Sequence, residues 1–326
     1  MSENFVMCVR DVKDGYFIPE PGLSSFLCVP EGENPSPVHK INPEEWVRKL
    51  MIASSWGKDS RGTGYDRGDL LIFIHGYNND QKTVMERHTL LKKGLGAAGF
   101  KGEILSFDWP SADSAINYLE DRHDAKKTAM QLVSDGISLL SERQRRGCIV
   151  NIHILAHSMG AYVVREAFDD ADDAHLMNNS WMISQIAFIA GDVSSGSLSL
   201  NNPSSESLYR HCARLTNYSN GNDSVLKLSN VKRIGIAPRA GRAGLPENIP
   251  TNAVNVECTD YFSKLETDEQ IRNRDQTPVC GSFDHAWYFG NRIFIRDLFE
   301  TLKGDSGRTS IPTRKVDENR KIVMLS

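Results

Sequence analysis

Short apolar runs alternate along most of this chain with longer segments that place apolar residues at helical spacing. The runs are rich in Ile, Leu, Val and Phe, which is typical of strands buried on both faces of a sheet. Their alternation with helices predicts an α/β fold, a mostly parallel sheet with helices on both faces. The predicted strands are Leu70–Ile74, Glu103–Phe107, a run from Ile149 to Ala156, Met182–Ile189, Arg214–Tyr218 and Ala253–Cys258, which we expect to end the sheet.

The same periodicity predicts the helices. One begins at Pro43, with Asn42 as its cap and proline at its first position. Two short strands, Phe5–Val9 and Ser25–Val29, precede it. The other predicted helices are Thr83–Ala97, Tyr118–Gln144, Ala161 to Phe168 and beyond, and a closing helix His285–Leu302. We predict an N-terminal extension packed on the core (residues 1–67), an α/β domain (68–304) and a C-terminal tail (305–326).

Composition narrows the class of protein. An apolar share of 40% and a charged share of 25% are those of an ordinary folded protein. The net charge of −4 and the scattered basic residues argue against nucleic-acid binding. The six cysteines include no zinc-binding pair, so we expect no metal. We predict no membrane span and, because the N-terminus has no secretory pattern, a cytoplasmic location.

The strand that begins at Ile149 ends in Ala156-His157-Ser158-Met159-Gly160, and a helical pattern follows at once. A serine between small residues at a strand–helix junction is typical of a nucleophile elbow, which presents the hydroxyl above the edge of an α/β sheet. Neighbouring backbone crowds this turn, and Ala156 is the least bulky substitute for the usual glycine. The pattern predicts Ser158 as a catalytic nucleophile.

A serine nucleophile needs a histidine to take its proton and a carboxylate to orient that histidine. In this fold the order along the chain is serine, acid, histidine. Only His175, His211 and His285 follow Ser158. His175 is too close to the elbow helix and His211 precedes a strand, whereas His285 follows the last predicted strand. We therefore predict His285 as the base.

Two aspartates compete for the role of the acid. Asp223 ends the loop Ser219-Asn220-Gly221-Asn222-Asp223, whose residues suit a tight turn after a strand. Asp192 follows the preceding strand, where some hydrolases place their acid, and a capping or loop-fixing role is its alternative. We favour Asp223 and leave Asp192 open.

An oxyanion hole needs two backbone N–H groups. Met159 supplies one, and Tyr77, in the turn His75-Gly76-Tyr77-Asn78, supplies the other. Gly76 lets the backbone approach closely, and we expect His75 to orient this loop. His153 and His157 are four residues apart, a spacing that binds metal on a helix but not here, on a strand and a turn.

The ordered set of motifs resembles a largely bacterial, lipase-like family of the α/β-hydrolase superfamily whose function is unknown. The resemblance covers roughly residues 68–300, and the chain departs from it at Asp108, where serine is common, and at Gly191, where proline is usual. The matching residues are Ile74–Asn79, Phe107–Ser111 with Tyr118, Asp121, Arg122 and Ala125, Ile154–Gly160, Ala190–Val193, Tyr218 and Ser219 with Asp223, and His285–Tyr288.

The resemblance implies an α/β-hydrolase fold and a serine-dependent carboxylic ester hydrolase of the carboxylesterase or lipase-like kind. The length of the interval Ser194–Arg210 indicates a short or minimal cap. The resemblance implies no metal or organic cofactor, and Ser158, Asp223 and His285 as the triad. The same triad would serve a thioesterase, amidase or acyltransferase. The alternative from another class is a catalytically silent scaffold that binds a partner.

The substrate is predicted less directly. The interval Ser194–Arg210 is too short for a full lid, so we expect a small to medium acyl ester. Arg239 or Arg242 either recognises an anionic substrate group or lies on a solvated loop. The oligomeric state stays open. The side chains expected to contact substrate are His157, Trp109, Asp108 and Trp287.

Overall fold

The computed structural model describes residues 3–58, 62, 64–111, 126–137, 148–173, 182–231, 237–318 and 322–326. Within these residues eleven strands form one sheet in the order β10-β11-β9-β8-β7-β6-β4-β5-β1-β2, with β3 paired to β4. The strands are β1 (Glu3–Lys13), β2 (Tyr16–Pro30), β3 (Ser55–Lys58), β4 (Asp66–Ile74), β5 (Glu103–Asp108), β6 (Cys148–His157), β7 (Ile183–Ile189), β8 (Cys212–Ser219), β9 (Ala253–Glu257), β10 (Arg314–Asp317) and β11 (Ile322–Leu325).

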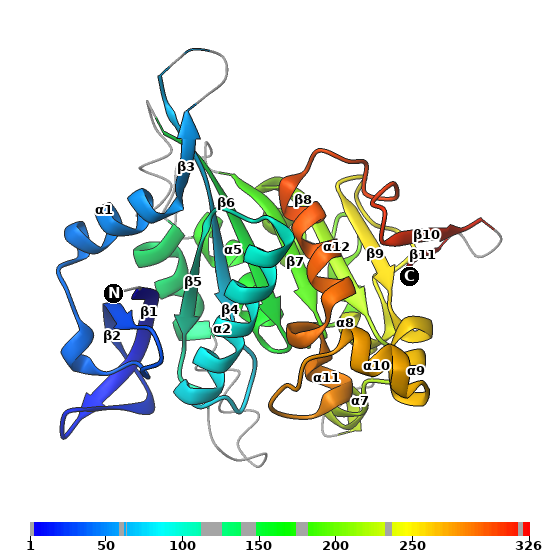
Figure 1. The fold of residues 1–326 in the computed structure, drawn as a ribbon, viewed down its shortest axis with the longest axis horizontal. Coiled ribbons are helices and arrows are strands. Elements are labelled where there is room, and N and C mark those ends of the chain that lie inside the picture. Colours follow the sequence, from blue (N-terminus) through cyan, green and yellow to red (C-terminus); the bar gives the residue numbers. More distant parts are fainter. Residues whose placement is uncertain are drawn as a thin grey trace.

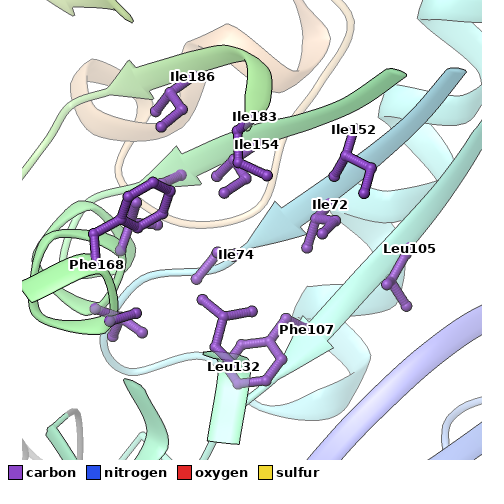
Figure 2. Packing of buried hydrophobic residues seen from close by; sticks show 14 of the residues in the cluster. Ile72, Ile74, Leu105, Phe107, Leu132, Ile152, Ile154, Phe168, Ile183 and Ile186 are labelled. Atoms are coloured by element: carbon purple, nitrogen blue, oxygen red, sulfur yellow. The ribbon is translucent and has the colours of Figure 1, made fainter. Parts of the chain in front are cut away.

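The six central strands are parallel, as their apolar runs predicted. Successive side chains of β4 enter two different cores, because a strand alternates its faces: Ile72 and Ile74 join one cluster, and Phe73 joins the other. Figure 2 shows part of the first cluster, where Ile72 and Ile154 from neighbouring strands pack together. The sheet is therefore buried on both faces.

Helices cover the two faces. The helix α5 (Gly160–Asp173) packs on the first cluster, and α2 (Gln81–Ala98) and α12 (Arg292–Lys303) pack on the second. Figure 1 shows α2 and α12 side by side in front of the sheet. The predicted helix over 118–144 lies mostly outside the described residues; 126–137 are helical and end in a π-helical segment, η2 (Leu132–Ile137).

Both ends of the chain join the sheet. At one side β1 pairs in parallel with β5, and at the other β11 pairs in parallel with β9 (Figure 1). The sheet thus crosses both predicted boundaries, 67/68 and 304/305. The prediction that Ala253–Cys258 ends the sheet is wrong, because the tail adds two further strands. These strands have only four residues each, too few for a recognisable alternation.

The predicted closing helix is also interrupted. It consists of α11 (Phe283–Ala286), the 3₁₀ turn η4 (Trp287–Gly290) and α12. Asn291 begins α12 anew, since its side chain accepts a hydrogen bond from the Phe294 N–H. At Gly290 a Cβ would lie 2.3 Å from the Thr277 carbonyl oxygen, so the chain passes close to its neighbour at the break. This break leaves His285 on a separate short helix.

Short helices make up the remaining connections. In α1 the Asn42 side chain accepts from the Glu44 N–H, which confirms the predicted cap. The β7–β8 connection holds only a 3₁₀ turn and one two-turn helix. No helix in the described part of the chain is both long and apolar enough to cross a membrane. The helices and 3₁₀ turns not given above are η1 (Pro37–His39), α1 (Pro43–Ser54), η3 (Ser195–Leu198), α6 (Pro203–Arg210), α7 (Ser224–Val231), α8 (Ala240–Ala243), α9 (Thr259–Thr267) and α10 (Glu269–Asp275).

Candidate active site

Ser158 lies in the sharp turn between β6 and α5, with a φ of 55°. This left-handed conformation is strained for a serine, and the surrounding backbone holds it. The Ser158 N–H donates to the Ile189 carbonyl (3.1 Å), and its own carbonyl accepts from the Asp192 N–H (2.8 Å). At Gly160 a Cβ would lie 2.5 Å from the Ile74 carbonyl oxygen, so only glycine fits there. The structure therefore has the strand–turn–helix that the sequence predicted.

His285 and Asp223 meet beside this turn. The His285 Nδ1 lies 2.7 Å from the Asp223 Oδ2, and both side chains are almost fully buried. A proton on Nδ1, donated to the carboxylate, leaves the lone pair on Nε2. The His285 ring also lies 4.7 Å, centroid to centroid, from the ring of His157, the residue before Ser158. The structure thus brings Asp223 and His285 into contact and places His285 beside the residue that precedes Ser158.

The carboxylate of Asp223 is held at its other end. Its Oδ1 accepts from the N–H of Leu226 in the first turn of α7 (2.8 Å), and its backbone carbonyl accepts from Arg242 Nη1 (2.8 Å). Asp192, the competing acid, instead faces Arg239: the Arg239 Nε lies 3.3 Å from the Asp192 Oδ1, and both are buried. Arg239 and Arg242 therefore contact protein groups rather than lying on a solvated loop.

His157 connects the elbow to the base. Burial, and then the charge of Arg87, hold the pKa of His157 well below its usual value, so the ring is neutral. Its Nε2 donates to the His285 carbonyl (3.0 Å), and its Nδ1 lies 3.4 Å from the Arg87 Nη1. Arg87 itself is buried over the Phe289 ring, 4.9 Å from its centroid. Sequence reasoning missed Arg87, because a charged residue in an amphipathic helix suggests a solvated side chain.

The turn after β4 packs against the nucleophile. At Gly76 a Cβ would lie 2.6 Å from the Ser158 Cβ, so the glycine makes this close approach possible. The Asn79 side-chain amide donates to the Gly76 and Tyr77 carbonyls (2.7 and 2.9 Å). In a trans peptide the N–H points opposite to the preceding carbonyl, so the Tyr77 N–H points away from the Asn79 amide. The Tyr77 and Met159 amides belong to the two segments that flank Ser158.

Three residues predicted to contact substrate are fully buried. Trp109 donates through Nε1 to the His75 carbonyl (2.8 Å) and stacks on the His75 ring. Trp287 packs among the aromatic rings of the second cluster. Asp108 is ion-paired with Arg10, 2.8 Å from its Nε. Because Asp108, Trp109 and Trp287 have no exposed surface, their predicted contact with substrate is not supported. His157 is 1% exposed, and its ring nitrogens are both engaged.

The other histidines near the strand ends have structural partners. Burial lowers the pKa of His75, whose Nδ1 donates to the Gly76 carbonyl (2.8 Å) and whose Nε2 accepts from the Trp109 N–H (3.1 Å). His153 Nε2 lies 3.1 Å from Asp69 Oδ1, so it does not share a partner with His157. Within the described ranges no group of three His, Cys, Asp or Glu side chains could hold a metal ion. His175 lies outside the described residues.

A comparison with known families identifies the fold. The family model of alpha/beta hydrolases of unknown function (DUF900) matches residues 62–261. The chain belongs to this family. The match confirms the predicted resemblance and, with the parallel central sheet, the α/β-hydrolase fold. It contains Ser158 and Asp223 but not β1, β2, His285 or the C-terminal strands.

Solved structures similar to this chain are distant in sequence. The phospholipase PlaB from Legionella pneumophila, in complex with thio-NAD, is 17% identical; the similarity covers 58% of this chain but only 37% of that one, with a TM-score of 0.29. Dienelactone hydrolase from Anabaena variabilis is 13% identical over 84% of this chain and 97% of that one, with a TM-score of 0.36. The RedJ thioesterase from Streptomyces coelicolor is 11% identical over 59% and 77%, with a TM-score of 0.30. No curated protein matches this chain.

Proposed function

We propose that this protein is a serine-dependent carboxylic ester hydrolase in which Ser158 is the nucleophile, His285 the general base and Asp223 the acid that orients it. The observation that carries the proposal is the 2.7 Å contact between His285 Nδ1 and Asp223 Oδ2 beside the strained elbow serine. A buried carboxylate on Nδ1 fixes the tautomer that accepts a proton at Nε2, which is what activation of a serine requires.

In the proposed reaction the Ser158 Oγ attacks the ester carbonyl carbon while His285 Nε2 takes the hydroxyl proton. Charge develops on the carbonyl oxygen, where the Met159 and Tyr77 N–H groups donate hydrogen bonds. The alcohol leaves with the proton from His285, and the acyl group stays on Ser158. Water then attacks this acyl-enzyme, gives its proton to His285 and releases the acid, which restores the Ser158 hydroxyl.

The substrate we propose is a small to medium acyl ester. The β7–β8 connection, where many lipases carry a lid, holds only η3 and α6, which supports a site without a large cap there. A series of p-nitrophenyl esters of graded acyl length tests this. The rate constant kcat/KM should be highest for short and medium chains; higher activity on long-chain esters than on short ones would contradict it.

Labelling with a fluorophosphonate probe tests the nucleophile. The native protein should react at one site, and Ser158→Ala should not react. Absence of labelling in the native protein would favour the scaffold that binds a partner. Labelling together with turnover of thioesters, amides or acyl acceptors in place of esters would keep the triad and change the substrate class.

A further inference from the structure

The N-terminal strand β1 contacts the turn that flanks the nucleophile. Cys8 of β1 lies opposite Asp108 at the end of β5, and a register shift in the β1–β2 pairing follows Cys8. Two residues on, Arg10 reaches the same aspartate: its Nε donates to Asp108 Oδ1 (2.8 Å), and its Nη2 donates to the Asn79 carbonyl (3.1 Å). Arg10 is 5% exposed and Asp108 is 0% exposed. One buried arginine therefore joins β1, β5 and the turn after β4.

Asp108 is a charged acceptor to which Gln81 and Cys8 donate as well as Arg10. Its Oδ2 accepts from Gln81 Nε2 at the start of α2 (2.9 Å) and from the Cys8 thiol (3.3 Å). Burial alone would raise the pKa of Asp108, but the charge of Arg10 beside it holds that pKa well below its usual range. Burial and the Asp108 charge raise the pKa of Cys8 well above its usual value, so the thiol keeps its proton and donates.

The turn is fixed at both of its ends through this cluster. At its far end, Arg10 holds the Asn79 backbone, and the Asn79 side chain holds the Gly76 and Tyr77 carbonyls. At its near end, Trp109, the residue after Asp108, donates its backbone and indole N–H groups to His75. Gly76, between them, lies so close to Ser158 that a Cβ on it would be 2.6 Å from the Ser158 Cβ. A shift of Arg10 or Asp108 would therefore move the peptide that carries the Tyr77 N–H.

We propose that Arg10 and Asp108 are positioning residues for the oxyanion hole, so that β1, which lies outside the matched residues 62–261, is a working part of the catalytic site. This inference rests on the proposed serine hydrolase function. Asp108 lies within the matched residues, and Arg10 supplies the opposite charge from a strand beyond them.

The chain offers a matched control at the opposite edge of the sheet. Arg314 of β10 forms a similarly buried ion pair with Asp297 of α12, 2.6 Å between Nη2 and Oδ1, with both side chains 0% exposed. Its further partners are Tyr218, Thr301 and the Arg308 carbonyl, which are not in the oxyanion turn. Loss of this pair should lower stability without moving the turn.

The experiment compares the double variants R10M/D108N and R314M/D297N, each of which removes a buried pair without leaving a lone charge. Both should lose thermal stability. R10M/D108N should lose about tenfold to a hundredfold in kcat with KM little changed, because a displaced donor acts mainly on the transition state. Trifluoromethyl ketones inhibit by forming an adduct with the serine that carries an oxyanion. The Ki of R10M/D108N for such an inhibitor should rise by about the factor by which kcat/KM falls. R314M/D297N should keep the native kcat and Ki.

Two results would overturn the inference: native kcat and Ki in R10M/D108N, or equal losses of kcat in both double variants. If R10M/D108N does not fold, Arg10→Lys keeps the charge but loses the fork that reaches both Asp108 and Asn79. Its kcat should fall several-fold, and an unchanged kcat would count against the inference. A native protein that neither hydrolyses esters nor reacts with a fluorophosphonate would refute the proposed function itself, and the inference with it.

Discussion

His285 is held by two residues, one at its ring and one at its backbone. Asp223 contacts its ring nitrogen, and His157 donates to its carbonyl, while Arg87 lies against the far side of the His157 ring. The His157 ring is neutral because it is buried beside the cationic Arg87. Its one proton is therefore available for the His285 carbonyl, which ties the backbone of the base to the elbow. The orientation of His285 thus depends on its backbone as well as on the acid.

The same substitution to asparagine should have different effects at the two candidate acids, Asp223 and Asp192. Asp223→Asn should lower kcat for ester hydrolysis by about a thousandfold to ten-thousandfold, because an amide no longer fixes the Nδ1–H tautomer of the base. Asp192→Asn should keep kcat within about tenfold of native and lower stability, since it leaves Arg239 with a weaker buried partner. Steady-state kinetics with a p-nitrophenyl ester measures both. A larger loss of kcat in Asp192→Asn would make Asp192 the acid.

The elbow and the turn after β4 form one unit built from close backbone contacts. Gly160 passes the Ile74 carbonyl and Gly76 passes the Ser158 Cβ, each nearer than any Cβ allows. Two segments about eighty residues apart in sequence meet because β4 and β6 are neighbours in the sheet and end at the same edge. This arrangement is what a parallel sheet provides: the carboxyl ends of its strands gather the loops that carry chemistry.

Gly76→Ala tests this unit. The added methyl group would displace either Ser158 or the turn, so we expect kcat to fall by at least about a hundredfold. Gly96→Ala is the matched control, because Gly96 lies within α2 with no atom near the position of a Cβ. That variant should keep its kcat and gain about 0.4–1 kcal/mol in free energy of unfolding. A Gly76→Ala variant with native kcat would contradict the proposed contact between the turn and the nucleophile.

At the scale of the whole molecule, the parts of the fold that follow from a local sequence pattern could be predicted. Apolar runs identified the six central strands. The order serine, acid, histidine pointed to His285 and left Asp223 and Asp192 as candidate acids, and the structure places Asp223 against His285. Contacts between residues far apart in the sequence leave no comparable pattern in it. Arg10 and Asp108 are 98 positions apart, so neither segment by itself indicates their ion pair. The four-residue tail strands were likewise too short to be recognised, and Trp109 and Trp287 looked like pocket residues because aromatic side chains at strand ends occur in both settings.

Buried histidines make the stability of the whole molecule sensitive to acid. Burial lowers the pKa of His88 to about 3, whereas the unfolded chain has the ordinary value of 6.5. Below 6.5 the unfolded state binds a proton that the native state does not, so the free energy of unfolding should fall by about 1.4 kcal/mol per pH unit from this residue as pH drops toward 3. His75 and His157, whose pKa values are also lowered, act in the same direction.

Urea unfolding between pH 6 and 5 measures this slope, and comparison with a variant cancels the contribution of carboxylates that begin to titrate near pH 5. The double variant H88L/S106A removes His88 together with its hydrogen-bond partner, the Ser106 hydroxyl. Its free energy of unfolding should depend less steeply on pH than that of the native protein, by about one proton. Equal slopes would mean that His88 is protonated in the native state.

The central claim is that Ser158 carries an acyl group during turnover, and measuring the mass of the acylated protein tests it most directly. The native protein is mixed with a p-nitrophenyl ester, quenched in acid during turnover, and examined by intact mass spectrometry with peptide mapping. We predict one acyl group per chain, carried on the peptide that contains Ser158, and neither adduct nor turnover in Ser158→Ala. Ester hydrolysis that persists in Ser158→Ala, or an acyl group mapped to another residue, would contradict the account.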